Sequence, residues 1–484
     1  MIAQYVPSIV ASVGGAMYGI DTGIIATTLS HESFNIYMFP PDGEDLALTG
    51  TIVSVYNAGQ CAGTFIGGWA ADRFSRKRAM TMACAVAIIG ITLQVSSVHV
   101  GMFITGRLTT GLSSGMILPV VPVYIAELSK PQNRGIIVGF QGMGMALGFM
   151  AANWIGYAGI FAEGDLAWRI PLAMQYPCAV FLLIGSNFIP FSPRWLMSRG
   201  SVHEARAVLE KLHRGEDASF IDREMAQMQE HLTIEQAIKS SGLFQSFTQL
   251  FFRKYIKRTA LACFCQVMTE LAGVSAIQNF QSIFYAAVGF TGDKALLISG
   301  IYGFMGVIGQ IISLTLIADK WKRTTTLWVG CAALAANLAI CMALSARFSD
   351  GSNLAASRAT IAFIFLYSCV FAAFFNSTVY VVSAELLPTF LRSKGLSLAT
   401  FLTGVTAIVM TQITPIAMDK IGWKYYSIFI ATNLVGMCIY KLLLPETQGL
   451  TLEEVGVLFG DEMPTEELEL DKIATQGDLT KERE

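Results

Sequence analysis

The sequence predicts an all-α membrane protein with twelve transmembrane helices in two six-helix halves. Three observations support this fold class. Hydrophobic residues make up 53% of the 484 residues and charged residues only 14%, whereas charged residues are about a quarter of an average soluble domain. The apolar residues come in blocks of about 20, the length that crosses a bilayer as a helix. Polar signatures in the first half of the chain recur in the second.

Twelve apolar blocks follow one another along the chain. The expected spans are 6–29, 50–71, 80–98, 102–125, 136–158, 168–190, 259–285, 295–317, 325–345, 360–384, 395–417 and 425–444. A charged stretch follows the sixth span, and within it 202–213 and 221–239 have the pattern of amphipathic cytosolic helices. The predicted organisation is an N-terminal half at 1–197, linker helices at 198–258, a C-terminal half at 259–455 and an acidic cytosolic tail at 456–484.

A carboxylate lies inside the first span. Asp21 belongs to the stretch Gly-Gly-Ala-Met-Tyr-Gly-Ile-Asp-Thr-Gly, and at such depth a charge costs about 3 kcal/mol or more unless it is paired. Its expected partner is Arg107, the one charged residue of the fourth span. The pair could simply lock two helices together. Intramembrane charges usually face a bundle interior or a water-filled cavity, so we favour a proton-coupling role in a transport path.

The loops give an orientation. Most of the 33 Lys and Arg residues fall in the loops after the second, fourth, sixth, eighth and tenth spans and in the C-terminal tail. Because cytosolic loops are enriched in Lys and Arg, these loops and both termini are predicted to be cytosolic.

The repeat consists of charged signatures at the cytosolic ends of the spans. Asp72-Arg73-x2-Arg76 is answered by Asp319-Lys320-x2-Arg323, and Glu127 with Arg134 is answered by Glu385 with Arg392. A basic loop alone would only follow the positive-inside rule, but the doubled Glu and Arg pattern can bridge neighbouring helices. We therefore expect a cytosolic gate of Asp72, Arg73, Arg76, Glu127, Arg134, Asp319, Arg323, Glu385 and Arg392, whose bridges break when the protein opens.

These residues closely resemble the sugar porter family of the major facilitator superfamily. The resemblance covers nearly the whole chain. It rests on Gly-Gly-x4-Asp21, Gly68-x3-Asp72-Arg73-x2-Arg76-Lys77, Gly106-Arg107, Pro122-Val-Tyr124-x2-Glu127, Ser192-Pro193-Arg194-Trp195, Glu385-Leu-x-Pro388-x3-Arg392 and Pro445-Glu446-Thr447-x-Gly449. It implies the major facilitator fold, alternating access, and a solute site between the halves. It also implies that Asp21 and Arg107 form the coupling pair of proton-coupled members and that Gln141 binds sugar.

The chain departs from the family in the seventh and tenth spans. Thr269-Glu270-Leu-Ala-Gly-Val-Ser275 replaces a motif with three amide side chains, and Tyr380 stands where the family has Trp. At 100° per residue, the seventh span has one polar face, made up of Gln266, Glu270, Ser275, Gln278, Gln281 and Ser282. Such residues can bridge helices, but a buried Glu270 favours a face that lines the solute site. The candidate substrate-binding residues are Gln141, Glu270, Ser275, Gln278 and Tyr380.

Two further departures lie at the cytosolic end. Ser75 stands where the family's loop usually has Gly, and Phe191 stands where Glu usually precedes Ser-Pro-Arg. One cytosolic bridge of the family is therefore expected to be missing.

The predicted function is a secondary transporter of a neutral sugar or sugar-like polyhydroxylated solute, coupled to proton symport, in the plasma membrane. Its partners are the solute, protons and the bilayer, and it is expected to act as a monomer, without nucleic acid, cofactor or metal. Nine cysteines lie within apolar runs, and no nucleophile–base constellation or phosphate loop indicates an enzyme. Alternatives are a polyol or cyclic hydroxy-acid carrier, a passive facilitator, or a non-transporting nutrient sensor, for which the 24 residues after Gly460 are a short tail.

Overall fold

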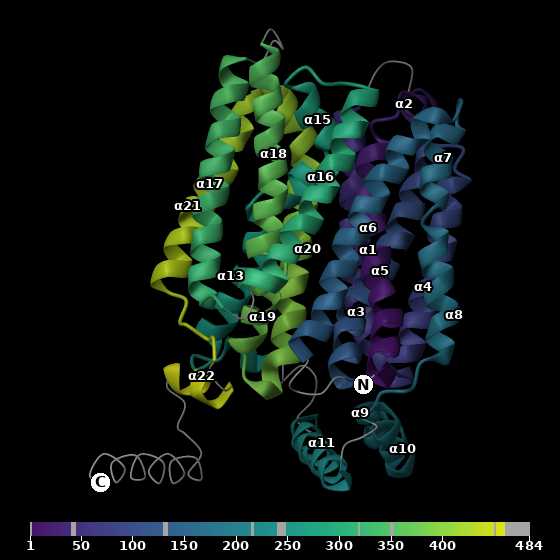
Figure 1. Ribbon diagram of the computed structural model, residues 1–484, viewed down its shortest axis with the longest axis vertical. Coiled ribbons are helices and arrows are strands. Elements are labelled where there is room, and N and C mark those ends of the chain that lie inside the picture. The colour runs from purple at the N-terminus through teal and green to yellow at the C-terminus, as the bar shows by residue number, and fades with distance from the viewer. Residues whose placement is uncertain are drawn as a thin grey trace.

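The computed structural model is a bundle of long helices running in nearly the same direction, with further helices beyond one end, among them α22 (Leu452–Leu458) (Figure 1). The structure describes residues 2–39, 45–128, 134–213, 217–239, 248–317, 320–348, 353–449 and 452–459. We call the end that carries the short helices α9 (Pro193–Ser198), α10 (Val202–Leu212) and α11 (Ala218–Lys239) the linker end. The opposite end carries α2 (Glu32–Met38) and is called the α2 end.

The described helices of the bundle fall into two groups, one before and one after the linker helices. The N-terminal group is α1 (Ile2–Thr28), α3 (Leu46–Phe74), α4 (Arg76–Val95), α5 (Val100–Leu128), α6 (Arg134–Ala158), α7 (Leu166–Ala173) and α8 (Tyr176–Phe188). The C-terminal group is α13 (Ile256–Leu271), α14 (Val274–Asn279), α15 (Gln281–Ala286), α16 (Asp293–Ile312), α17 (Arg323–Arg347), α18 (Leu354–Phe374), α19 (Thr378–Glu385), α20 (Thr389–Ile421) and α21 (Tyr426–Leu442).

Ten helical stretches among the described residues are long and apolar enough to cross a membrane. One of them, Lys394–Leu442, contains both α20 and α21, which η5 (Gly422–Tyr425) separates. The second expected span, α3, is longer than most of the others but carries more polar residues and is not among the ten. With these two corrections the helices account for the twelve predicted spans, and the all-α fold class is confirmed.

The seventh span differs from the continuous helix that the sequence pattern assumed. Gly273 has a φ of +103°, in the left-handed region that glycine adopts at no steric cost, and this ends α13. A second interruption at Phe280 separates α14 from α15. Because the helical phase is reset twice, the polar residues do not form the single face expected: Gln266 and Gln281 are buried, while Glu270, Ser275 and Gln278 are half-buried.

The first and fifth spans pack unusually closely. A Cβ on Gly148 of α6 would lie 2.1 Å from the carbonyl oxygen of Ala16, and one on Gly19 of α1 would lie 2.1 Å from that of Met145. Glycines on both helices therefore let the two backbones touch, as small residues do in membrane helix pairs. This contact sets α1, with Asp21, directly against α6, with Gln141.

The two halves share one apolar core near the α2 end. It joins Ile24 and Ile25 of α1 to Ile277, Phe280 and Phe284 of the broken seventh span, and α1 contacts both α14 and α15. Toward the linker end the N-terminal half has a separate core, made of its own residues and of Leu212 from α10. The described halves thus pack together through this core, and they also meet along α3 and α20, where Gln412 accepts a hydrogen bond from Ser54 and Phe401 packs on Phe65.

The linker contains two helices where two amphipathic helices were expected, but only α10 gathers its apolar residues on one face, and those of α11 are spread around the helix. The predicted ranges 202–213 and 221–239 correspond to α10 and α11, which lie beyond the bundle (Figure 1). The sequence analysis did not anticipate α9, which begins at Pro193 with Ser192 as its N-cap. The predicted acidic tail lies outside the described residues after position 459.

Candidate functional site

Asp21 is buried between α1 and α5, with 3% of its surface exposed. Its Oδ2 accepts a hydrogen bond of 2.8 Å from the Ser114 hydroxyl, and its Oδ1 is buried without a hydrogen-bond partner. Ser114 lies two helical turns beyond Arg107 on α5, so both side chains point from the same helix toward α1. A buried carboxylate with an oxygen left unsatisfied is costly as an anion and gains from carrying a proton.

Arg107 is fully buried and lies beside Asp21 without a direct contact to its carboxylate. Its Nη1 donates to the backbone carbonyl of Asp21 at 3.3 Å, and its guanidinium carbon lies 4.3 Å from the ring centroid of Tyr56 on α3. Its Nε and Nη2 are buried without hydrogen-bond partners. The predicted partners are therefore neighbours, with the cation held over an aromatic face, and no ion pair within 4.0 Å joins these two described side chains.

Glu270 is the acidic group that faces across the two halves. It lies one residue before the end of α13, accepts a hydrogen bond from Ser275 of α14, and is half-buried. The hydroxyls of Tyr18 on α1 and Tyr380 on α19 both lie within electrostatic range of its carboxylate. Among the described residues no Lys, Arg or His nitrogen lies within 4.0 Å of it. Tyr380 is the more exposed of these two tyrosines, with 49% of its surface exposed, whereas Tyr18 is half-buried.

Gln141 lies on the opposite side of the same region. It is buried on α6, and its Cγ would be 3.2 Å from a Cβ on Gly15 of α1. The next residue, Gly142, faces Gln310 of α16, whose Nε2 donates to Ser377 and whose Oε1 accepts from Asn376. Gln310 and its partners in the C-terminal half thus lie beside α6 at the residue that follows Gln141.

Charged groups at the linker end of the N-terminal half form one cluster. Arg76 lies 3.3 Å from Asp72 and 3.0 Å from Glu127, and it also donates to the Ala71 carbonyl. Trp195 of α9 donates through Nε1 to the Asp72 carbonyl at 3.2 Å. The cluster ties α3, α4, α5 and α9 together.

The Arg73 backbone belongs to the same cluster. Its carbonyl accepts a hydrogen bond from the guanidinium of Arg199, the residue that follows α9. Arg73 therefore takes part in the cluster through its backbone carbonyl. The last turn of α3 accepts two hydrogen bonds in this region, from Trp195 of α9 and from Arg199, which follows α9.

The C-terminal half has the matching cluster. Arg323 at the start of α17 lies 3.9 Å from Glu385, the last residue of α19, and Glu385 accepts a 2.6 Å hydrogen bond from Thr447. Arg392 of α20 lies within electrostatic range of Glu385. The bridges described for Arg76 and Arg323 each join elements of one half, so in both halves the repeated charges brace the linker-end helix termini.

Glu446 explains why α17 begins where it does. Its carboxylate accepts from the backbone N–H groups of Arg323 and Thr324, at 2.8 and 3.2 Å, and from the Thr324 hydroxyl. These are helix N-terminal donors that the N-cap Lys322 leaves without a side-chain partner. Burial raises the pKa of Glu446, but the hydrogen bonds from Thr324, Gln448 and Arg323 outweigh it and the pKa is lowered.

Two of the nine expected gate residues are not placed. Asp319 lies outside the described residues, and the side chain of Arg134 is likewise not described. The other seven fall into the two clusters: Asp72, Arg73, Arg76 and Glu127 in one, and Arg323, Glu385 and Arg392 in the other.

Four residues of the site were missed by the sequence analysis. Tyr18, Tyr56 and Ser114 contact or lie near predicted site residues, and Gln310 lies beside Gly142, the neighbour of Gln141. Gln310 could have been found, because an amide in the middle of an apolar span needs a polar partner. Nothing in the sequence marks Ser114, Tyr18 or Tyr56 as site residues, because hydroxyl and aromatic residues are common in membrane spans.

Removing both acidic braces should favour opening at the linker end, because each brace fixes the linker-end helix termini of its half that must meet the other half when this end closes. Each brace is partly exposed and contributes about 1 kcal/mol or less, so Glu127→Ala with Glu385→Ala should shift the conformational equilibrium by up to about 30-fold. A cysteine introduced at Ser275, in a background depleted of accessible cysteines, would report this as faster labelling by an impermeant maleimide from the linker side.

The matched control removes two carboxylates from the linker instead. Glu210 and Asp222 pair with Arg206 on exposed surfaces of α10 and α11, so Glu210→Ala with Asp222→Ala should leave labelling unchanged. If both double variants were labelled at the same rate, the braces would not control opening, and their charges would serve only to orient the spans in the membrane.

Two groups of six spans, with the buried charges of Asp21 and Arg107 inside the first group, are the arrangement expected of a multi-pass membrane transporter of the major facilitator type. Residues 8–459 match the family model described as "Sugar (and other) transporter". The chain therefore belongs to the sugar porter family of the major facilitator superfamily, which is a family of transporters and not of enzymes. The family and the fold expected from the sequence are confirmed.

Several known proteins are similar over nearly the full chain. The MFS-type transporter criB of Aspergillus cristatus is 31% identical over 454 residues, which are 94% of this chain and 92% of that protein. The high-affinity glucose transporter of Kluyveromyces lactis is 27% identical, covering 95% and 86%. The solved structure of the proton:xylose symporter XylE from E. coli has a TM-score of 0.77 at 22% identity, covering 94% and 99%, and this likeness confirms the fold.

Proposed function

We propose that this protein is a secondary active transporter that moves a neutral sugar or sugar-like polyhydroxylated solute by alternating access with proton symport. The observation that supports it best is the polar cluster between the halves, where Glu270 and Tyr380 of one half approach Tyr18 of the other. A solute bound there touches both halves, so its binding free energy can differ between the conformations that open to either side.

The side chains of the cluster fit a solute with many hydroxyl groups. A carboxylate accepts charge-assisted hydrogen bonds from vicinal hydroxyls, amides such as Gln141 and Gln278 both donate and accept, and a tyrosine ring packs on the apolar face of a sugar ring. An anionic solute would be repelled by Glu270 in a low-dielectric site. The glucose and xylose named for two of the similar proteins are neutral and polyhydroxylated.

Proton coupling is proposed for Asp21. Its Oδ1 has no hydrogen-bond partner and the Arg107 guanidinium is turned onto Tyr56, which is the arrangement expected when the carboxylate carries a proton. Loss of that proton would draw Arg107 to the carboxylate and change the α1–α5 contact. The apolar packing at the α2 end then corresponds to a conformation closed on the outside, given both termini in the cytosol and the protein in the plasma membrane.

The function is tested by uptake into cells that lack their own sugar transporters. Labelled hexoses, pentoses, polyols and sugar acids would be compared in cells with the full chain and in cells with an empty vector, at external pH 5 and 7 and with an uncoupler.

We expect concentrative uptake of at least one neutral sugar or sugar-like solute, stronger at the lower pH and lost with the uncoupler. Uptake restricted to sugar acids would replace the neutral-solute proposal with a hydroxy-acid carrier. Uptake that stops when the internal solute concentration equals the external one would indicate a facilitator. If the protein reaches the cell surface but takes up no solute, a sensor would be favoured.

A further inference from the structure

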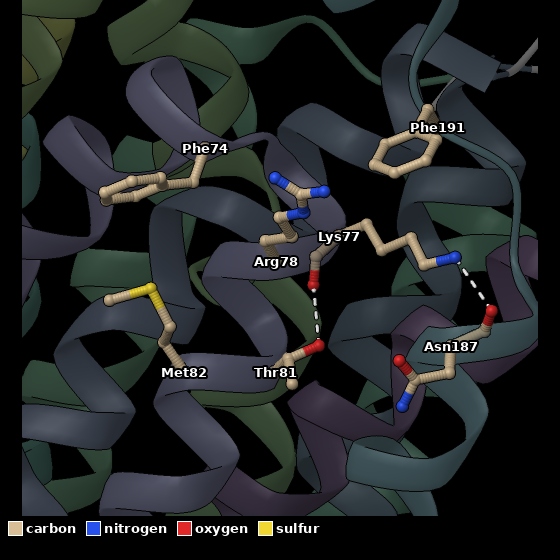
Figure 2. A pocket seen from close by; sticks show the side chains of 7 residues that line it. All are labelled: Phe74, Lys77, Arg78, Thr81, Met82, Asn187 and Phe191. Carbon is tan, nitrogen blue, oxygen red and sulfur yellow. Dashed lines mark hydrogen bonds between the residues drawn. The ribbon is translucent and has the colours of Figure 1, made fainter.

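A basic pocket lies at the linker end between α4 and the ends of α3 and α8. Its volume is about 470 Å³, and none of the residues that line it is acidic. Lys77 and Arg78 bring two positive charges to it, while Thr81, Met82, Asn187 and Phe191 supply most of the remaining wall (Figure 2). It belongs neither to the proposed solute site nor to the braces of the linker end.

Phe191 explains why the two charges have no acidic partner in the pocket. The Lys77 ammonium lies 5.0 Å from the Phe191 ring centroid, and the Arg78 guanidinium carbon lies 5.9 Å from it. The family usually has Glu at this position, which would neutralise one of the cations. An aromatic ring attracts cations but carries no net charge, so the pocket remains doubly positive.

The hydrogen-bond donors of the pocket also remain largely available. Lys77 uses one of its three N–H groups on the Asn187 carbonyl at 2.7 Å (Figure 2), and among the described residues no side-chain acceptor lies within hydrogen-bond distance of the Arg78 guanidinium, which has five N–H groups. Both residues lie in the first turn of α4, where the helix dipole adds positive potential. Ser75, with its φ of +108°, caps this turn by accepting from the Arg78 N–H.

We propose that this pocket binds the phosphate group of an anionic phospholipid from the leaflet at the linker end. Lys and Arg together with helix N-terminal N–H groups form a typical phosphate site. Basic pockets between transmembrane helices on the cytosolic side bind lipid head groups, and the linker end is cytosolic in the orientation proposed above.

The surroundings of the pocket favour a lipid over a soluble phosphate. Phe74 and Met82 line it with 36% and 39% of their surfaces exposed, and Phe188, beside the lining residue Asn187, is 85% exposed. These side chains lie at the ends of membrane spans, where acyl chains would cover them. A phosphate held by Lys77 and Arg78 thus has its apolar chains beside apolar side chains.

Native mass spectrometry of the purified full chain in neutral detergent tests the proposal. Dioleoylphosphatidylglycerol, dioleoylphosphatidylcholine and inorganic phosphate would be titrated separately. We expect one phosphatidylglycerol site that is about 30-fold tighter than any phosphatidylcholine site, because two basic side chains near the membrane surface each strengthen the binding of an anionic lipid.

Three variants locate the site. Lys77→Gln with Arg78→Gln should reduce the lipid preference to about threefold or less. Phe191→Glu should do the same while keeping both cations, because the new carboxylate pairs with them. The matched control, Lys320→Gln with Lys441→Gln, removes two charges from the linker end of the other half and should keep the preference.

Each contrary outcome overturns the proposal in a defined way. Equal loss of preference in the control pair would mean that general surface charge attracts the lipid. An undiminished preference in Phe191→Glu and in Lys77→Gln with Arg78→Gln would place the lipid elsewhere. Inorganic phosphate binding as tightly as phosphatidylglycerol, and competing with it, would identify a soluble phosphate as the ligand.

Discussion

Replacing Asp21 with asparagine is expected to abolish accumulation of solute against its gradient while exchange of solute across the membrane continues. Asparagine has the same shape and can still accept the hydrogen bond from Ser114, and Arg107 still donates to the backbone carbonyl at this position. The variant cannot lose a proton, so the step that links proton binding to the movement of the halves disappears.

The measurement compares concentrative uptake, counterflow exchange and solute-driven alkalinisation of the medium. Wild-type protein should show all three, and Asp21→Asn should retain only exchange. Asp165→Asn is a matched control, because this exposed carboxylate pairs with Arg169 outside the bundle core, and it should retain all three.

A second variant separates the carboxylate from its hydrogen bond. Ser114→Ala keeps the ionisable group but removes the donor that stabilises its charged form, so the pH dependence of uptake should move to higher pH without loss of coupling. If wild-type uptake ignores both pH and uncouplers, Asp21 and Arg107 are a structural pair and the protein is a facilitator.

The sequence was sufficient for the spans because their signal is local. Twenty consecutive apolar residues have few alternatives to a membrane helix, and even α3, which is more polar than its neighbours, was found between two charged loops. The break at Gly273 was not anticipated, since a glycine inside an apolar run is as compatible with a packed helix as with a left-handed turn.

Side-chain pairing was harder to predict than position. Burial and charge alone made Arg107 the expected partner of Asp21, and both residues do lie together. The contact to Tyr56 depends on how closely α3 approaches α5, and the cross-half approach of Tyr18 to Glu270 depends on how the halves pack. Such relations between distant segments leave no periodicity in one sequence.

Replacing Glu270 with glutamine is expected to change which solutes bind more than it changes expression. A hydrogen bond to a charged group contributes about 1.5–3 kcal/mol and a neutral one about 0.5–1.5 kcal/mol, so the affinity for the neutral solute should fall about tenfold. The loss of negative charge should also let anionic sugar acids bind, because their repulsion by the carboxylate is removed.

Ligand-dependent thermal stabilisation of the purified protein measures both effects, with neutral sugars and sugar acids compared in wild type, Glu270→Gln, Glu270→Ala and Ser275→Ala. Ser275→Ala is the matched control: it keeps the charge and removes the neighbouring hydroxyl, so it should still exclude sugar acids. If Glu270→Gln and Glu270→Ala bind the same solutes as wild type with the same affinity, Glu270 does not contact the solute. Its carboxylate would then serve to connect α13 to α14 across the break at Gly273, and the solute site would have to be sought along α6 and α16, where Gln141 and Gln310 lie.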